Sequence, residues 1–227
     1  MTPEDLKDKK NLFRKNLSSF ALHFHRFLDK FSLLSVPKVG SSNIREWSAR
    51  EGLKSGPGRT GEFLGEVYSF WREPRERIMS GLATDMNWLA YARGGLAKTF
   101  AWEYDQHRDL YLDTMRQWCC DPRLSPLQLG DLICPFSHHA PYRALVNFHR
   151  VDHFVSVDQI ALLPAYLNKK YGLNLGPIGS GPDMNQVGWM PTAVFSDVLS
   201  RHPRAHDLVL QYIDQDRFRP CLLDLSS

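Results

Sequence analysis

The sequence predicts an α/β protein with a central parallel sheet flanked by helices, in a single domain over residues 1–227. Short apolar runs typical of buried strands alternate along the chain with segments of helical periodicity. The length of 227 residues suffices for one large domain with its own core. Hydrophobic residues make up 43% and charged residues 23%, near the average for globular domains. These values exclude a disordered, collagen-like or low-complexity chain.

The N-terminal 29 residues predict an amphipathic helix packed on this domain. Thr2, Pro3, Glu4 and Asp5 are typical of a helix start: a capping hydroxyl, proline in the first turn, and acids near the positive end of the helix dipole. Apolar residues then recur at steps of three and four, which indicates one helical face. They are Leu12, Phe13, Leu17, Phe20, Phe24, Phe27 and Leu28. We expect the histidines at 23 and 25 to be surface or packing residues on helices.

Three apolar runs predict strands at residues 31–36, 65–71 and 153–157. Helical patterns separate and follow these strands. We expect helices at 44–47, from 73 to about 120 with an interruption at the glycines 94 and 95, from Pro164 onward, at 192–201 and at 205–216. Glycine and proline predict loops over 51–62 and 174–190.

Charge and composition limit the partners. The formal net charge of +3 suits an anionic ligand without identifying one, and no Lys/Arg run argues for nucleic acid. No apolar stretch approaches the roughly 18 residues of a membrane span. Charged residues throughout positions 2–29 leave no apolar signal-peptide core, so we expect a cytoplasmic protein. The four cysteines form no C-x-x-C pair, and we expect reduced thiols.

The segment between the first predicted strand and the next helix is typical of an anion-binding loop. Glycine and small hydroxyl residues let backbone N–H groups turn inward, and the following helix adds its positive end. Lys38 supplies a charge, and Ser41, Ser42 and Asn43 offer further hydrogen bonds. The loop is not a Walker A motif, because Lys38 precedes Gly40 instead of following the second glycine.

A second anion-binding candidate follows the strand predicted at 65–71. Arg72 lies at a strand end, where ligands of open α/β sheets bind, and its planar guanidinium can hold a phosphate through two hydrogen bonds. Pro74 fixes the start of the next helix. Ser80 lies two turns into that helix and offers a hydroxyl.

The motifs Pro37-Lys38-Val39-Gly40-Ser41-Ser42 and Arg72-x-Pro74-x-x-Arg77-x-x-Ser80 together resemble the sulfotransferase superfamily. The resemblance is closest to the Golgi carbohydrate sulfotransferases and their bacterial relatives. The stretch from Val151 to Asp158 is similar to a late strand of that family. The resemblance covers roughly residues 28–82 and 150–186.

The resemblance implies a P-loop-like sheet and 3′-phosphoadenosine-5′-phosphosulfate as the donor, with 3′-phosphoadenosine-5′-phosphate as the product and no metal. The acceptor would be a hydroxyl of a glycan or another small molecule. The 5′-phosphosulfate would be held by Lys38, Val39, Gly40, Ser41, Ser42 and Asn43. Arg72 and Ser80 would hold the 3′-phosphate. Lys38 would also stabilise the charge that develops on the departing phosphate.

For the general base the resemblance leaves alternatives, because relatives use a Glu or a His. Glu62, which ends the glycine-rich loop, is the first choice, with Glu51 and Glu66 as other acids in the interval. His139, beside His138 in a proline-flanked loop, is the rival; the pair has no Cys or acid at zinc-ligand spacing. Two other functions remain open: a phosphoryl transferase or kinase, and a nucleotide-binding protein without turnover. The sequence does not indicate an oligomeric state.

Overall fold

The computed structural model describes residues 23–35, 41–57, 63–77, 151–179, 201–215 and 219–226, with shorter pieces between 113 and 129. The chain divides into two compact units. One consists of residues 1–17, 74–139 and 182–217, and the other of residues 18–73, 140–181 and 218–227. The sequence-based assignment of a single domain over 1–227 stays a prediction.

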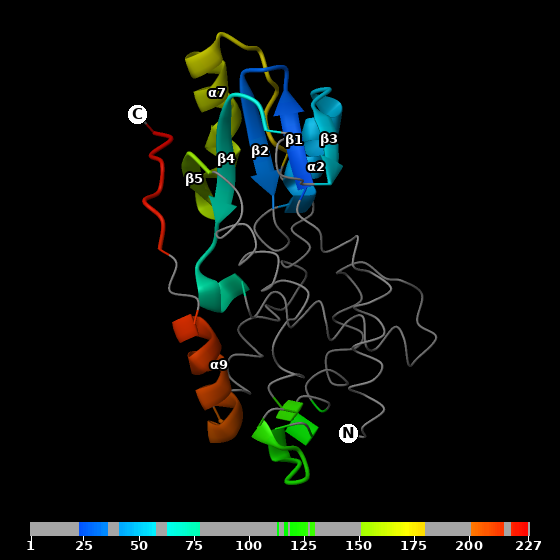
Figure 1. Ribbon diagram of the computed structural model, residues 1–227, viewed down its shortest axis with the longest axis vertical. Coiled ribbons are helices and arrows are strands. Elements are labelled where there is room, and N and C mark those ends of the chain that lie inside the picture. The colour runs from blue at the N-terminus through cyan, green and yellow to red at the C-terminus, as the bar shows by residue number, and fades with distance from the viewer. Residues whose placement is uncertain are drawn as a thin grey trace, which may run out of the picture. The chain divides into compact units, whose positions relative to one another are not determined.

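The second unit contains a five-stranded sheet in the order β3-β1-β2-β4-β5 (Figure 1). The strands are β1 (His23–Phe27), β2 (Phe31–Ser35), β3 (Lys54–Pro57), β4 (Glu66–Trp71) and β5 (His153–Ser156). Strands β2, β4 and β5 are parallel, whereas β1 is antiparallel to both β2 and β3. Together with the helices described below, this sheet confirms the α/β class.

The three predicted strands form a parallel part of the sheet, as expected, but β1, which is antiparallel to β2 and β3, makes the sheet mixed. Strands β1 and β2 are joined by the turn at Leu28–Lys30, and so short a connection permits only an antiparallel pair. Leu28 takes the left-handed conformation in this turn, with φ of 48°. The glycine-containing stretch 51–62, predicted as a loop, contributes strand β3 at its centre.

The predicted N-terminal helix is also wrong over residues 23–27, which form β1; residues 1–22 lie outside the described part of the chain. The apolar spacing of Phe24 and Phe27 fits a helix, but tertiary pairing decides in favour of the strand. Phe27 stacks on Phe31 across the hairpin, with ring centroids 5.7 Å apart. Phe24 meets the ring of Phe63 edge-on at 6.3 Å. His25, expected on a helix, is in β1 and only 1% exposed.

Helix α2 (Ser41–Arg50) connects β2 to β3 and includes the predicted helix 44–47. After β5, the short 3₁₀ helix η3 (Val157–Leu162) leads into α7 (Leu163–Tyr171). Helix α7 has Pro164 in its first turn, as predicted, and ends at Gly172, whose φ of 62° is the left-handed conformation typical of a helix terminus. The C-terminal segment adds to the edge of β5, where the Leu223 N–H donates to the Phe154 carbonyl at 2.7 Å.

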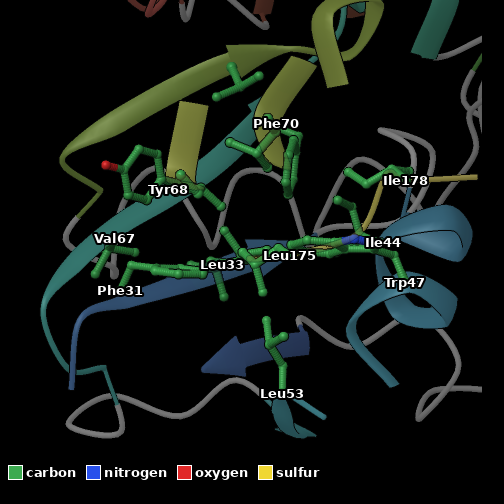
Figure 2. Packing of buried hydrophobic residues seen from close by; sticks show 14 of the residues in the cluster. Phe31, Leu33, Ile44, Trp47, Leu53, Val67, Tyr68, Phe70, Leu175 and Ile178 are labelled. Carbon is green, nitrogen blue, oxygen red and sulfur yellow. The ribbon is translucent and has the colours of Figure 1, made fainter. Parts of the chain in front are cut away.

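The core of this unit surrounds β2, all five residues of which are buried (Figure 2). Leu33 and Leu34 point to opposite faces of the sheet and both are fully buried, so β2 is covered on both faces. Helix α2 contributes Ile44 and Trp47 to the core, and the Trp47 indole N–H donates to the Gly176 carbonyl at 2.8 Å. Each such large side chain contributes about 1.5–3 kcal/mol by leaving water.

The first unit includes helix α9 (Pro203–Gln215), which confirms the helix predicted near residues 205–216. A guanidinium N–H of Arg204, in its first turn, donates to the Leu124 carbonyl at 2.5 Å. Just before the helix, Nδ1 of His202 lies 3.7 Å from the Sγ of Cys120. Residues 74–77 are helical in this unit as well, so the helix start at Pro74 is confirmed.

Candidate anion-binding edge of the sheet

The carboxyl ends of β2, β4 and β5 meet at one edge of the sheet, because the three strands are parallel and adjacent. The register places Leu34 of β2 opposite Ser69 of β4, and Trp71 of β4 opposite Ser156 of β5. Neighbouring strands lie about 4.8 Å apart. The chain segments that leave β2 and β4 therefore start one strand spacing from each other.

The segment that leaves β2 leads to the N-terminus of α2. Ser41, Ser42 and Asn43 are the first three residues of this helix, and Asn43 is half-buried. The backbone N–H groups of a first turn have no partner within the helix, and the helix dipole is positive there. The first turn of α2 contains no acidic residue that would repel an anion. This end of the helix is thus chemically suited to a phosphate or sulfate group.

Arg72 is the first residue after β4, at the same edge of the sheet, and its side chain is half-buried. On the far side of β4, Ser156 ends β5, and its hydroxyl accepts a hydrogen bond from the Asp158 N–H at 3.3 Å. Asp158 itself is exposed. The segments that follow the adjacent strands β2 and β4 thus include the first turn of α2 and the guanidinium of Arg72.

The remaining predicted site residues lie outside the described residues. These are Lys38, Val39 and Gly40 of the loop, Ser80, and the candidate bases Glu62 and His139. Their roles stay predictions from the sequence.

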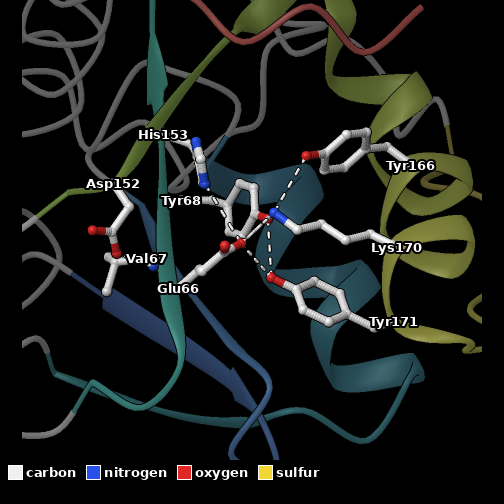
Figure 3. A network of polar contacts seen from close by, with 8 residues as sticks. All are labelled: Glu66, Val67, Tyr68, Asp152, His153, Tyr166, Lys170 and Tyr171. Carbon is white, nitrogen blue, oxygen red and sulfur yellow. Dashed lines mark hydrogen bonds and ion pairs between the residues drawn. The ribbon is translucent and has the colours of Figure 1, made fainter. Parts of the chain in front are cut away.

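A polar network occupies the opposite, amino-terminal edge of the same strands (Figure 3). Glu66, the first residue of β4, accepts hydrogen bonds at one carboxylate oxygen from the hydroxyls of Tyr68 and Tyr171, at 2.7 and 2.6 Å. The Lys170 ammonium donates to the same oxygen, and the Nε2 of His153 lies 3.5 Å from it. Helix α7 is thereby tied to the start of β4.

The network holds Glu66 ionised. Burial acts to raise its pKa, but hydrogen bonds from Lys170, Tyr171 and Tyr68 outweigh burial and lower the pKa from 4.5 to about 2. Burial and the neighbouring hydroxyl and carboxylate raise the pKa of Tyr68, so this phenol remains a donor. The ammonium of Lys170 also lies within 5.6 Å of the ring centroids of Tyr68, Tyr166 and Tyr171.

This geometry argues against Glu66 as a general base for chemistry at the carboxyl edge of the sheet. A carboxylate with a pKa near 2 accepts a proton poorly at neutral pH. Glu66 and Arg72 also stand at opposite ends of β4, and six residues of strand rise span about 20 Å. Sequence reasoning did not find the partners on α7, which lie about a hundred positions away. One sequence feature could have indicated this network. Glu66 and Tyr68 are two residues apart, and in a strand this spacing places both side chains on one face.

Three further findings bear on function. Within the described residues there is no group of three or more His, Cys, Asp or Glu side chains that could hold a metal ion. In that part of the chain no helix is both long and apolar enough to cross a membrane. Comparisons with protein-family models, with curated proteins and with solved structures give no significant match.

Proposed function

We propose that this protein is a sulfotransferase that moves a sulfuryl group from 3′-phosphoadenosine-5′-phosphosulfate to a hydroxyl acceptor, with a carbohydrate as the favoured acceptor class. The observation that carries the proposal is that the two candidate anion-binding segments follow adjacent parallel strands. The start of α2 and Arg72 follow the carboxyl ends of neighbouring parallel strands, although 31 positions separate Ser41 from Arg72 in the sequence.

The donor's chemistry matches this arrangement. Its 5′-phosphosulfate and its 3′-phosphate are both attached to one ribose, so its two anionic groups need sites only about one sugar apart. A helix N-terminus on one strand and a guanidinium on the next provide two such sites. In a P-loop-like arrangement the segment 38–43 binds the phosphosulfate, and Arg72 with Ser80 binds the 3′-phosphate.

The transfer requires little covalent chemistry from the protein. The acceptor oxygen attacks the sulfur, and the bond between sulfur and the bridging phosphate oxygen breaks. The acceptor proton passes to a base, for which Glu62 is the first candidate and His139 the second. The departing phosphate gains negative charge, which Lys38 stabilises. Positioning and charge stabilisation supply most of the rate enhancement, by analogy with phosphoryl transfer.

The proposal is tested first by ligand binding. Thermal unfolding is followed with 3′-phosphoadenosine-5′-phosphate, with adenosine 5′-phosphate, and with ATP plus Mg²⁺. A ligand at 100 times its dissociation constant stabilises the protein by about 2.7 kcal/mol. We expect the bisphosphate to raise the midpoint most, and adenosine 5′-phosphate much less.

Transfer is then measured with donor carrying labelled sulfate and a panel of oligosaccharides and simple alcohols. Stabilisation by ATP and Mg²⁺ alone would indicate a phosphoryl transferase instead. Strong binding of the bisphosphate without transfer to any acceptor would favour a binding protein without turnover. Failure of the bisphosphate to bind would overturn the proposal.

A further inference from the structure

A buried histidine in β1 connects three strands next to the proposed donor site. His25 is 1% exposed and pairs in register with Ser55 of β3 and with Leu33 of β2. Its Nδ1 lies 2.8 Å from the Ser55 hydroxyl, and its Nε2 lies 3.5 Å from the hydroxyl of Ser35. Both ring nitrogens thus contact serine hydroxyls on strands that flank β1.

His25 and the two serines form a continuous set of polar contacts across three strands. The Ser55 hydroxyl also donates to the Leu53 carbonyl at 3.4 Å. A serine hydroxyl both donates and accepts, so either tautomer of His25 can bond to both serines. The Ser35 side chain at the end of β2 thus contacts His25 of β1 whichever ring nitrogen carries the proton.

Ser35 is the last residue of β2, immediately before the segment that carries Lys38. Leu34, the residue before Ser35, is held by the neighbouring strand β4. The buried Ser69 hydroxyl of β4 donates to the Leu34 carbonyl at 2.8 Å. The final two residues of β2 are therefore each held by a side-chain hydrogen bond from a different neighbouring strand. A loop that must place a charge on a ligand needs such a rigid support.

We propose that His25 is a positioning residue for donor binding: through Ser35 it fixes the end of β2 and thereby the start of the anion-binding loop. This inference rests on the proposed function, because it assigns the loop a donor to bind. His25 touches neither donor nor acceptor in this role. Its effect appears as donor affinity, and not as acceptor affinity.

The test uses a matched pair of serine substitutions in β2. Ser35→Ala removes the hydroxyl next to the loop. Ser32→Ala removes an equally buried hydroxyl of the same strand, which bonds to the backbone of Leu64 at 2.9 and 3.1 Å. We expect both variants to lower the unfolding midpoint. Only Ser35→Ala weakens the binding of 3′-phosphoadenosine-5′-phosphate, by about five- to tenfold in calorimetry.

Substitutions of the histidine extend the test. His25→Gln keeps one donor and one acceptor and retains most of the affinity, whereas His25→Leu loses as much affinity as Ser35→Ala. The double variant His25→Leu/Ser35→Ala has the same affinity for the bisphosphate as the single variant that binds it more weakly, because both substitutions remove the same contact. The KM for the acceptor stays unchanged in all of them.

The outcomes separate the two proposals. If the unsubstituted protein does not bind the bisphosphate, the proposed function fails. If it binds, and Ser35→Ala binds as tightly as Ser32→Ala, the donor site stands and the role of His25 is refuted. Should His25→Leu fail to fold, the serine pair alone decides.

Discussion

Replacement of Glu66 by glutamine tests the polar network at the amino-terminal edge of the sheet. The substitution keeps the size of the side chain and removes the charge that Lys170 pairs with. The hydroxyls of Tyr68 and Tyr171, which donate to the carboxylate, keep only a neutral acceptor. We expect a less stable protein whose fold and donor binding are intact, because the network lies at the opposite end of β4 from Arg72.

The magnitude follows from the pKa of Glu66. A fall from 4.5 to about 2 corresponds to about 3.4 kcal/mol at 1.36 kcal/mol per pKa unit. The Glu66 side chain is 40% exposed, so solvent screening reduces this value. We expect Glu66→Gln to lower the free energy of unfolding by about 1–2 kcal/mol at pH 7.

The pH dependence has a definite sign. Because the pKa of Glu66 is depressed in the folded state, its contribution is fully present above about pH 4.5 and is lost as the pH falls toward 2. Urea unfolding of both proteins at pH 7, 5, 4 and 3 measures the difference. The difference should be constant from pH 7 to 5 and shrink below that.

The control is Glu46→Gln, which neutralises an exposed carboxylate of α2. It should change stability by no more than about 0.5 kcal/mol at any of these pH values. A Glu66→Gln protein as stable as the Glu46→Gln control at pH 7 would refute the reasoning. A difference that does not shrink in acid would show that the charge of Glu66 is not its origin.

Three further predictions concern the proposed reaction. Lys38→Ala should lower the transfer rate by about 10²–10³ with the unfolding midpoint retained, and near-normal turnover would remove Lys38 from the site. Arg72→Ala should cost about 2–5 kcal/mol of donor binding. The Arg72→Ala variant should bind adenosine 5′-phosphate and the 3′,5′-bisphosphate equally well. The control variant Lys54→Ala, in the edge strand β3, should still prefer the bisphosphate. Glu62→Gln should lose about 10²–10⁴ in turnover and far more than His139→Ala, with donor affinity kept in both; the reverse ranking would assign the base to the histidine.

The strands at 31–36, 65–71 and 153–157 could be predicted because each is a short, nearly continuous apolar run. Such runs arise when a strand is covered on both faces, as β2 is. Helix α7 could be placed because Pro164 in the first turn is a local signal. The adjacency of β2 and β4, which the segments leading to α2 and to Arg72 follow, could only be expected from the resemblance.

The errors have a common physical origin. Phe24 and Phe27 stand at helical spacing, but the same two positions pack well from opposite faces of a strand. Strand β3 contains Gly56 and Pro57, which disfavour strands by local preference. It forms because it pairs with β1, with Gly56 in register opposite Phe24. In both places the partner strand outweighs the local preference.

By itself the sequence determined the α/β class, three of the strands, and the residue types able to bind anions near Lys38 and Arg72. These properties depend on side-chain chemistry and on neighbours within a few positions along the chain. Tertiary structure alone decided the antiparallel edge of the sheet, the burial of His25 and the coupling of Glu66 to Lys170. Each of these depends on residues that are distant in sequence, and pairing between strands, not local propensity, brings them together.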